Sequence, residues 1–217
     1  MIGLIGAHRT GKTTLAKAWV EWKQRSGYHV KYLTISAGTV IQETLGVDCG
    51  EITSIDDRLK VQRALTDRYE ATMESHTKFG GELVFVIDRT PLDIAAYTLA
   101  EAGQHLTMDQ AKEVCAIVER CYALTEKYLS YLIFLPPVLP YVVEDGKPPL
   151  NAAYQQHISA LMLGLMSDGA RMPNVTYSMM PEQLRTVTER SCAIDQVVGN
   201  IGVYAFQEVA TGAAQLS

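Results

Sequence analysis

The sequence has no long uninterrupted apolar run and no paired cysteines. The apolar stretch 131–143 is broken by three prolines, whereas a membrane-spanning helix needs about 20 consecutive apolar residues. The four cysteines form no C-x-x-C pair and have no histidine at a zinc-binding spacing: they are Cys49, Cys115, Cys121 and Cys192. An apolar strand begins almost at the first residue and leaves no room for an export signal. We therefore expect reduced thiols in a cytoplasmic protein without membrane contact.

Basic residues are also too few for a general nucleic-acid-binding surface. The chain has 19 Lys and Arg against 24 Asp and Glu, a formal net charge of −5, which argues against such a role but leaves room for a local basic pocket. Hydrophobic residues make up 47% of the 217 residues. That share supports a buried core, excludes a disordered chain and suits a single domain over 1–217.

Strand-like and helix-like segments alternate along the chain. The apolar segment 83–88 is the clearest strand, because its consecutive apolar residues suit burial on both faces of a parallel sheet. Further strands are expected at 2–6, 29–34, 128–135 and 174–180, and helices at 12–25 and 54–78 and after Thr90 and Thr107. This alternation predicts an α/β fold with a mainly parallel five-stranded sheet and helices on both faces.

One motif dominates the sequence. Residues 6–13, GAHRTGKT, fit the phosphate-binding pattern G-x-x-x-x-G-K-[ST] between a strand and a helix. The glycines let backbone N–H groups surround a phosphate, the lysine reaches the β- and γ-phosphates, and the hydroxyl of Thr13 binds Mg²⁺. We therefore predict nucleotide contacts from the loop and the start of the helix: Gly6, Ala7, His8, Arg9, Thr10, Gly11, Lys12, Thr13 and Thr14.

Two further segments accompany the loop. The third strand ends in Asp88-Arg89-Thr90-Pro91-Leu92-Asp93, and the segment 140–147 reads PYVVEDGK. With these elements the sequence resembles the P-loop nucleoside and nucleotide kinases, nearest to the nicotinamide-riboside-kinase-like AAA-type ATPases of phage and bacterial origin and more loosely to thymidylate kinases. The resemblance implies a three-layer P-loop NTPase sandwich with strand order 2-3-1-4-5, a small lid at about 137–151, and ATP with Mg²⁺ as cofactors.

The catalytic candidates follow from charge and position. Asp88 ends an apolar strand, where it suits either a Mg²⁺ carboxylate or a general base for the acceptor. Arg89 can bind a phosphate by forked hydrogen bonds. Arg9, inside the loop, is placed to stabilise the transferring phosphoryl group or else points to solvent. Lys12 completes the predicted catalytic set.

The acceptor and lid residues are less well defined. Ser36 follows the second strand, Arg58 and Gln62 lie one turn apart on the next predicted helix, and Asp93 serves either the acceptor or the N-terminus of its own helix. In the lid, Lys147 is expected to close over the phosphates, although the family pattern prefers Arg there. The family's E-x-x-R after the second strand is absent, which leaves the acceptor open.

The last part of the chain carries few charges. The segment 191–217 contains no Lys or Arg, so we interpret it as packing against the domain or across a homodimer. Arg171, Arg185 and Arg190 near the last strand either flank the adenine or are surface charges.

Together these observations predict an ATP- and Mg²⁺-dependent kinase for a nucleoside- or nucleotide-like acceptor. A deoxynucleoside monophosphate, a riboside and a hydroxymethylated base in DNA are the options, and the acidic composition disfavours the DNA. The alternative is a regulatory NTP-binding or NTP-hydrolysing P-loop ATPase, which would be expected to carry an acidic pair at the end of the third strand, where this chain has Asp88-Arg89.

Overall fold

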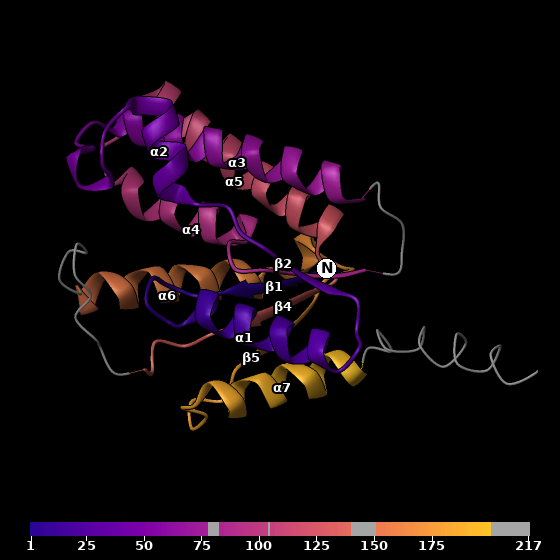
Figure 1. Ribbon diagram of the computed structural model, residues 1–217. Coiled ribbons are helices and arrows are strands. Elements are labelled where there is room, and N and C mark those ends of the chain that lie inside the picture. Colours follow the sequence, from indigo (N-terminus) through magenta and orange to yellow (C-terminus); the bar gives the residue numbers. More distant parts are fainter. Residues whose placement is uncertain (78–82, 104, 140–150, 201–217) are drawn as a thin grey trace, which may run out of the picture.

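A computed structural model describes residues 1–77, 83–103, 105–139 and 151–200. Its centre is a five-stranded parallel sheet of short apolar segments, in the order β2-β3-β1-β4-β5. The strands are β1 (Ile2–Ile5), β2 (Val30–Leu33), β3 (Val84–Ile87), β4 (Tyr131–Phe134) and β5 (Thr176–Met179). The strand order and the α/β class predicted from the sequence are confirmed (Figure 1).

Helices cover both faces of the sheet. One side carries α2 (Ala37–Leu45), α3 (Ile55–Thr77), α4 (Pro91–Ala102), α5 (Met108–Tyr128) and α6 (Ala152–Ser167), and the other carries α1 (Lys12–Arg25) and α7 (Val187–Asn200). Short 3-10 turns lie at Cys49–Glu51 and Gly169–Arg171. Among the described residues, no helix is long and apolar enough to span a bilayer.

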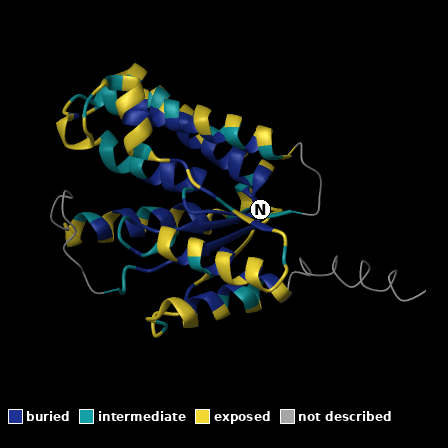
Figure 2. Cartoon of the chain, viewed as in Figure 1, coloured by how far each residue is buried: buried dark blue, intermediate teal, exposed yellow. Residues whose placement is uncertain are grey.

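Side chains of the central strands alternate between the two hydrophobic cores. Ile5, Ile87 and Phe134 pack beneath α3 to α6, whereas Leu4, Val86 and Ile133 pack against α1 and α7. Two successive side chains of a strand point to opposite faces, so a strand buried on both faces must be apolar throughout. Figure 2 shows this pattern as a buried sheet between helices that are exposed on their outer sides.

The sequence signals for helix ends are confirmed at two positions. Thr90 and Asp93 form a capping box at the start of α4, and Thr107 and Gln110 form one at the start of α5. Three helices were not foreseen, namely α2, α6 and α7. In α7, Ile194 and Val198 are fully buried and Lys23 of α1 pairs with Asp195 at 2.8 Å, so the first part of the predicted tail packs against the domain.

Candidate active site

The loop between β1 and α1 is held in a conformation that requires glycine at two points. A Cβ atom on Gly6 would lie 2.7 Å from the carbonyl oxygen of Leu135, and Gly11 has a φ of +82°. Arg9, between them, has a φ of 61°, which is unusual for a residue with a side chain. Such backbone strain persists where surrounding contacts enforce it, and functional loops are where it is commonly found.

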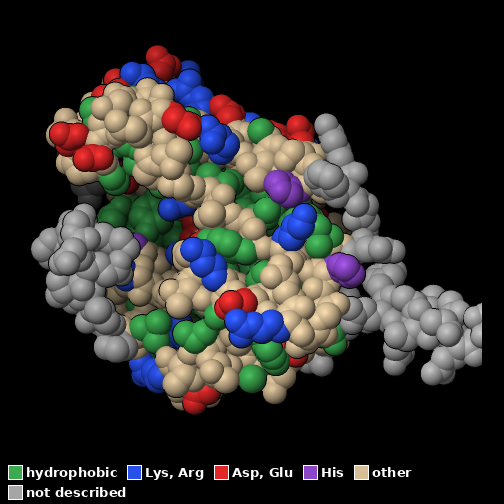
Figure 3. Space-filling view, in the orientation of Figure 1, with side chains coloured by type: hydrophobic (Ala, Val, Ile, Leu, Met, Phe, Trp, Pro, Cys, Tyr) green, Lys and Arg blue, Asp and Glu red, His purple; other side chains and the backbone are tan. Residues whose placement is uncertain are grey.

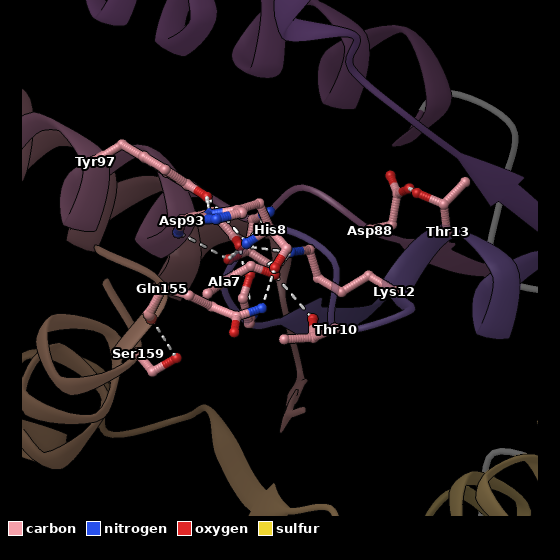
Figure 4. A network of polar contacts seen from close by, with 12 residues as sticks. Ala7, His8, Thr10, Lys12, Thr13, Asp88, Asp93, Tyr97, Gln155 and Ser159 are labelled. Carbon is pink, nitrogen blue, oxygen red and sulfur yellow. Dashed lines mark hydrogen bonds and ion pairs between the residues drawn. The ribbon is translucent and has the colours of Figure 1, made fainter. Parts of the chain in front are cut away.

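Lys12 lies inside the curve of this loop. Its Nζ donates hydrogen bonds to the carbonyl oxygens of Gly6 and Ala7, the latter at 3.1 Å, and lies 3.6 Å from Oδ1 of Asp93 (Figure 4). Burial lowers the pKa of Lys12 and Arg89 adds to this effect, whereas Asp93 opposes it. A phosphate in the loop would give this half-buried cation a second anionic partner beside Asp93.

Asp93 is already engaged by the protein. It is buried, its Oδ2 accepts hydrogen bonds from the backbone N–H and the hydroxyl of Thr90 at 2.8 and 2.7 Å, and its Oδ1 accepts a long one from the N–H of Gly6 at 3.5 Å. It does not line the cleft described below. The arrangement favours a structural role over the acceptor contact considered from the sequence.

A second polar cluster joins Thr13 and Asp88. The Thr13 hydroxyl donates a hydrogen bond to Oδ2 of Asp88, which also accepts one from the hydroxyl of Tyr32 at 2.7 Å. Burial, followed by the bond to Asp88, raises the pKa of Tyr32 to about 12, so its hydroxyl remains a donor. The other oxygen, Oδ1, is buried and receives no hydrogen bond. A hydroxyl oxygen beside an unsatisfied carboxylate oxygen fits Mg²⁺, which prefers hard oxygen ligands.

A cleft of about 960 Å³ opens in front of the loop. It brings together most of the predicted residues, which come from four separate segments of the chain. Lining residues among these predictions are His8, Arg9, Thr10, Gly11, Lys12, Thr13, Thr14, Ser36, Arg58, Gln62, Asp88 and Arg89. Gly6 and Ala7 lie behind the cleft, as part of the buried loop backbone. Lys147 and most of the predicted lid lie outside the described residues.

Helix α4 runs along the cleft from the loop to a polar cluster. Asp93, Tyr97 and Glu101 follow one another at intervals of four residues, so Glu101 lies about 12 Å along the helix from Asp93. The Tyr97 hydroxyl accepts a hydrogen bond from the N–H of His8 at 3.1 Å and lies 3.3 Å from its Nδ1. Burial raises the pKa of Tyr97. The His8 ring also stacks on Tyr154 of α6, with the ring centroids 5.8 Å apart.

The cluster at the other end consists of Arg58, Gln62 and Glu101. Oxygens of Glu101 lie 3.4 Å from Nη1 of Arg58 and 3.3 Å from Nε2 of Gln62. Burial raises the pKa of Glu101, while Arg58 and Gln62 oppose the shift. The positive charge of Arg58 is thus balanced by the carboxylate of Glu101. This end of the cleft is therefore polar but carries no net positive charge.

Several residues that shape the site were not identified from the sequence. Tyr97 stands one turn after Asp93 on a predicted helix, so helical periodicity could have placed it beside the loop. Tyr32, Glu101 and Tyr154 carried no motif, and neither did Gln155, which donates a hydrogen bond to the carbonyl oxygen of His8. Arg190 was interpreted as a surface charge or an adenine contact, but it is 2% exposed and donates a hydrogen bond to the phosphate loop.

This fold and loop define a P-loop nucleotide-binding protein. A family model described as an AAA domain matches residues 1–173, and the chain belongs to that family of P-loop AAA domains. Among solved structures, a thymidylate kinase from Candida albicans, described for its broad substrate specificity, matches with a TM-score of 0.63 and 14% sequence identity, over 93% of this chain and 92% of that chain. No match was found among curated protein sequences. The resemblance to P-loop nucleotide kinases is thereby confirmed at the level of family and fold.

Proposed function

We propose that the protein is an ATP-dependent phosphotransferase whose preferred acceptor is a nucleoside monophosphate. The observation that carries the proposal is the division of charge along the cleft. Arg9, Lys12 and Arg89 line the end at the phosphate loop, whereas Arg58 at the other end is paired with Glu101. Phosphates suit the first end and an uncharged nucleobase suits the second.

The dimensions support the same acceptor. The two ends are separated by two turns of α4, about 12 Å, which is close to the span from the phosphate to the far edge of the base in a nucleotide. The aromatic side chains of Tyr97 and Tyr154 line the cleft between and beside these ends. A riboside would leave the loop-end cations with fewer anionic partners.

A DNA acceptor is supported less well. In the view of Figure 3, acidic and basic side chains are interspersed over α2 and α3 and do not form one basic track. A duplex substrate would be expected to need several phosphate contacts from Lys and Arg. The formal net charge of −5 points the same way.

The chemistry assigned to the chain is mainly positioning and charge stabilisation. An acceptor oxygen forms a bond to the γ-phosphorus of ATP while the bond to the β–γ bridging oxygen breaks, and ADP leaves with that electron pair. In this assignment Lys12 and the loop N–H groups hold the donor phosphates, and Arg9 and Arg89 neutralise the charge on the transferring group. Thr13 and Asp88 would hold Mg²⁺, which supplies Lewis-acid neutralisation of the phosphate oxygens when bound.

The proposal assigns Asp88 to the metal in preference to the general base. Its Oδ2 is occupied by the hydroxyls of Thr13 and Tyr32, so the carboxylate faces the phosphate loop side of the cleft. A phosphate acceptor needs no general base, because its oxygen is already deprotonated at neutral pH. A hydroxyl acceptor would have to lose a proton, and this favours the monophosphate again.

The test is an ADP-release assay with ATP and Mg²⁺ over a panel of acceptors: nucleoside monophosphates, nucleosides, and duplex DNA with hydroxymethylated bases. We expect monophosphates to stimulate release most, and Lys12→Ala to abolish the stimulation. ADP release that is independent of any acceptor would support the regulatory ATPase and contradict the kinase. Stimulation by nucleosides or by DNA alone would contradict the assigned acceptor.

A further inference from the structure

The phosphate loop is contacted from outside by two side chains from distant helices. Gln155 of α6 donates a hydrogen bond from Nε2 to the carbonyl oxygen of His8 at 2.7 Å, and Arg190 of α7 donates one from Nη1 to the carbonyl oxygen of Thr10 at 3.1 Å. The two helices lie on opposite faces of the sheet. Both side chains are buried, Gln155 at 7% and Arg190 at 2% exposed.

Each of these contacts fixes a peptide plane. In a trans peptide the C=O group and the next residue's N–H group point in opposite directions, and the described part of the chain contains no cis peptide bond. With the His8 carbonyl drawn toward Gln155, the N–H of Arg9 points the other way. With the Thr10 carbonyl drawn toward Arg190, the N–H of Gly11 does the same. Gln155 is labelled beside the loop in Figure 4.

These two peptides flank strained backbone. Arg9 has a φ of 61° and Gly11 a φ of +82°, so the loop needs outside contacts to hold N–H groups that would otherwise be free to rotate away. A concave row of N–H groups is the feature of this loop that binds phosphate. A peptide rotated the wrong way would present a carbonyl oxygen to the anion in place of a donor.

Arg190 also brings a buried positive charge to the loop. Its Nε donates to the carbonyl oxygen of Leu184 at 3.0 Å, and its Nη2 is buried without a hydrogen-bond partner. Burial lowers the pKa of Arg190, and the nearby Arg185 adds to this. Among the described residues, its hydrogen-bond partners are carbonyl oxygens, so phosphates bound in the loop would be the anions that favour this buried cation.

The helix that carries Arg190 is firmly placed. At its start, the carboxylate of Glu189 accepts a hydrogen bond from the N–H of Thr186, and the hydroxyl of Thr186 accepts one from the N–H of Glu189. Further along, Ile194 is fully buried and Asp195 pairs with Lys23 of α1 at 2.8 Å. A side chain on such a helix can hold a fixed geometry at the loop.

From these contacts we propose that Gln155 and Arg190 are positioning residues, which preset the Arg9 and Gly11 N–H groups of the phosphate loop for the donor nucleotide. The inference rests on the proposed nucleotide donor but not on any particular acceptor. It predicts that the affinity for the donor nucleotide depends on α6 and α7, through the hydrogen bonds that Gln155 and Arg190 donate to the loop backbone. It also assigns Arg190 a role at the donor phosphates in place of the adenine contact considered from the sequence.

The test measures ADP binding by calorimetry, without turnover, in Arg190→Met and Gln155→Met. Each replacement keeps a long side chain in the core and removes the donor. We expect each to weaken ADP binding about tenfold. Arg190→Lys, which retains a donor, should recover part of the loss. Asp195→Asn is the control, because it removes the α1–α7 ion pair without touching the loop, and it should bind ADP as the wild type does.

Steady-state kinetics separate positioning from mere stability. We expect the KM for ATP to rise in Arg190→Met and Gln155→Met while the KM for the acceptor stays within about twofold. ADP affinity within twofold of wild type in both Met variants would overturn the inference. So would a loss that Asp195→Asn shares in full, since α7 docking alone would then explain it. If the wild type binds ADP but no acceptor is phosphorylated, the proposed function fails, and the calorimetric comparison still decides this inference.

Discussion

The hydroxyl of Thr13 donates a hydrogen bond to Oδ2 of Asp88, joining the start of α1 to the end of β3 across 75 residues of sequence. Tyr32 holds the same oxygen from the end of β2. Side chains from β2, from the end of β3 and from the start of α1 therefore meet at the carboxyl edge of the sheet, where open α/β sheets bind their ligands. Oδ1 of Asp88 is buried and receives no hydrogen bond, so it is the atom that the proposed function assigns to Mg²⁺.

The first prediction concerns this carboxylate. Tyr32→Phe should keep the fold but let the Asp88 carboxylate rotate, because one of the two donors to Oδ2 is lost. We expect the Mg²⁺ concentration for half-maximal activity to rise about three- to tenfold, as for one hydrogen bond to a charged group. A Mg²⁺ titration of ADP release measures it. Tyr177→Phe, on an exposed side chain of β5, is the control and should titrate as wild type. Equal titrations for all three proteins would contradict the role of Tyr32.

The second prediction separates the two roles of Asp93, which caps α4 and contacts Lys12 of the loop. Asp93→Ala removes the N3 side chain of the α4 capping box and also the carboxylate beside Lys12. Gln110→Ala removes the matching capping side chain of α5, which does not line the cleft. Both should lower the free energy of unfolding by about 1 kcal/mol for the cap, with a larger loss for the buried Asp93. Urea unfolding measures this.

Only the Asp93 variant should also alter nucleotide binding, because only Asp93 contacts Lys12 and the N–H of Gly6. Calorimetry with ADP provides that comparison. If Gln110→Ala and Asp93→Ala changed ADP affinity equally, the contact between Asp93 and the loop would make no specific contribution to nucleotide binding.

The local features of the site were readable from the sequence, whereas the contacts between distant segments were not. The G-x-x-x-x-G-K-T pattern predicted the loop because phosphate binding dictates residue types at fixed spacing. Thr90 and Asp93 were readable as a cap for the same reason. By contrast, Gln155 and Arg190 reach the loop from 147 and 180 residues away, and nothing local marks them. Arg190 lies just before the segment interpreted as a tail, on a helix that was not predicted, so its burial depended on a packing arrangement that no pattern encodes.

Helix α2 was not predicted because its own sequence carries little periodic signal. Helix α2 has nine residues, begins at the N-cap Ser36 and ends at Gly46 in the left-handed conformation. Its short length gave few turns from which to read a period, and its stability comes from packing Val40 and Ile41 onto α3. The Gly46 stop was the signal that could have identified it.

The third prediction concerns the acceptor end of the cleft. Glu101→Gln leaves Arg58 without its half-buried carboxylate partner and turns a balanced pair into a net cation. We expect the KM for a nucleoside monophosphate to rise about three- to tenfold, while the KM for ATP is unchanged because the proposed function puts the donor at the other end. Glu113→Gln breaks the surface pair with Arg63 and should leave both constants unchanged. A rise in the ATP constant alone would place Glu101 at the donor and contradict the division of the cleft.

The last prediction concerns pH. Burial lowers the pKa of His8 below 6.5, and Lys12 and Arg9 add to the effect, so the unfolded chain takes up a proton at this residue at a higher pH than the folded protein does. Stability contributed by neutral His8 is therefore complete above pH 6.5 and is lost as pH falls through that value toward the lowered folded-state pKa. Urea unfolding between pH 5 and 7.5 should show a smaller decline toward low pH in His8→Gln than in wild type. His157→Gln, which removes an exposed histidine of α6, is the control. Parallel curves for wild type and His8→Gln would show that burial and the loop's cations do not disfavour protonation of His8.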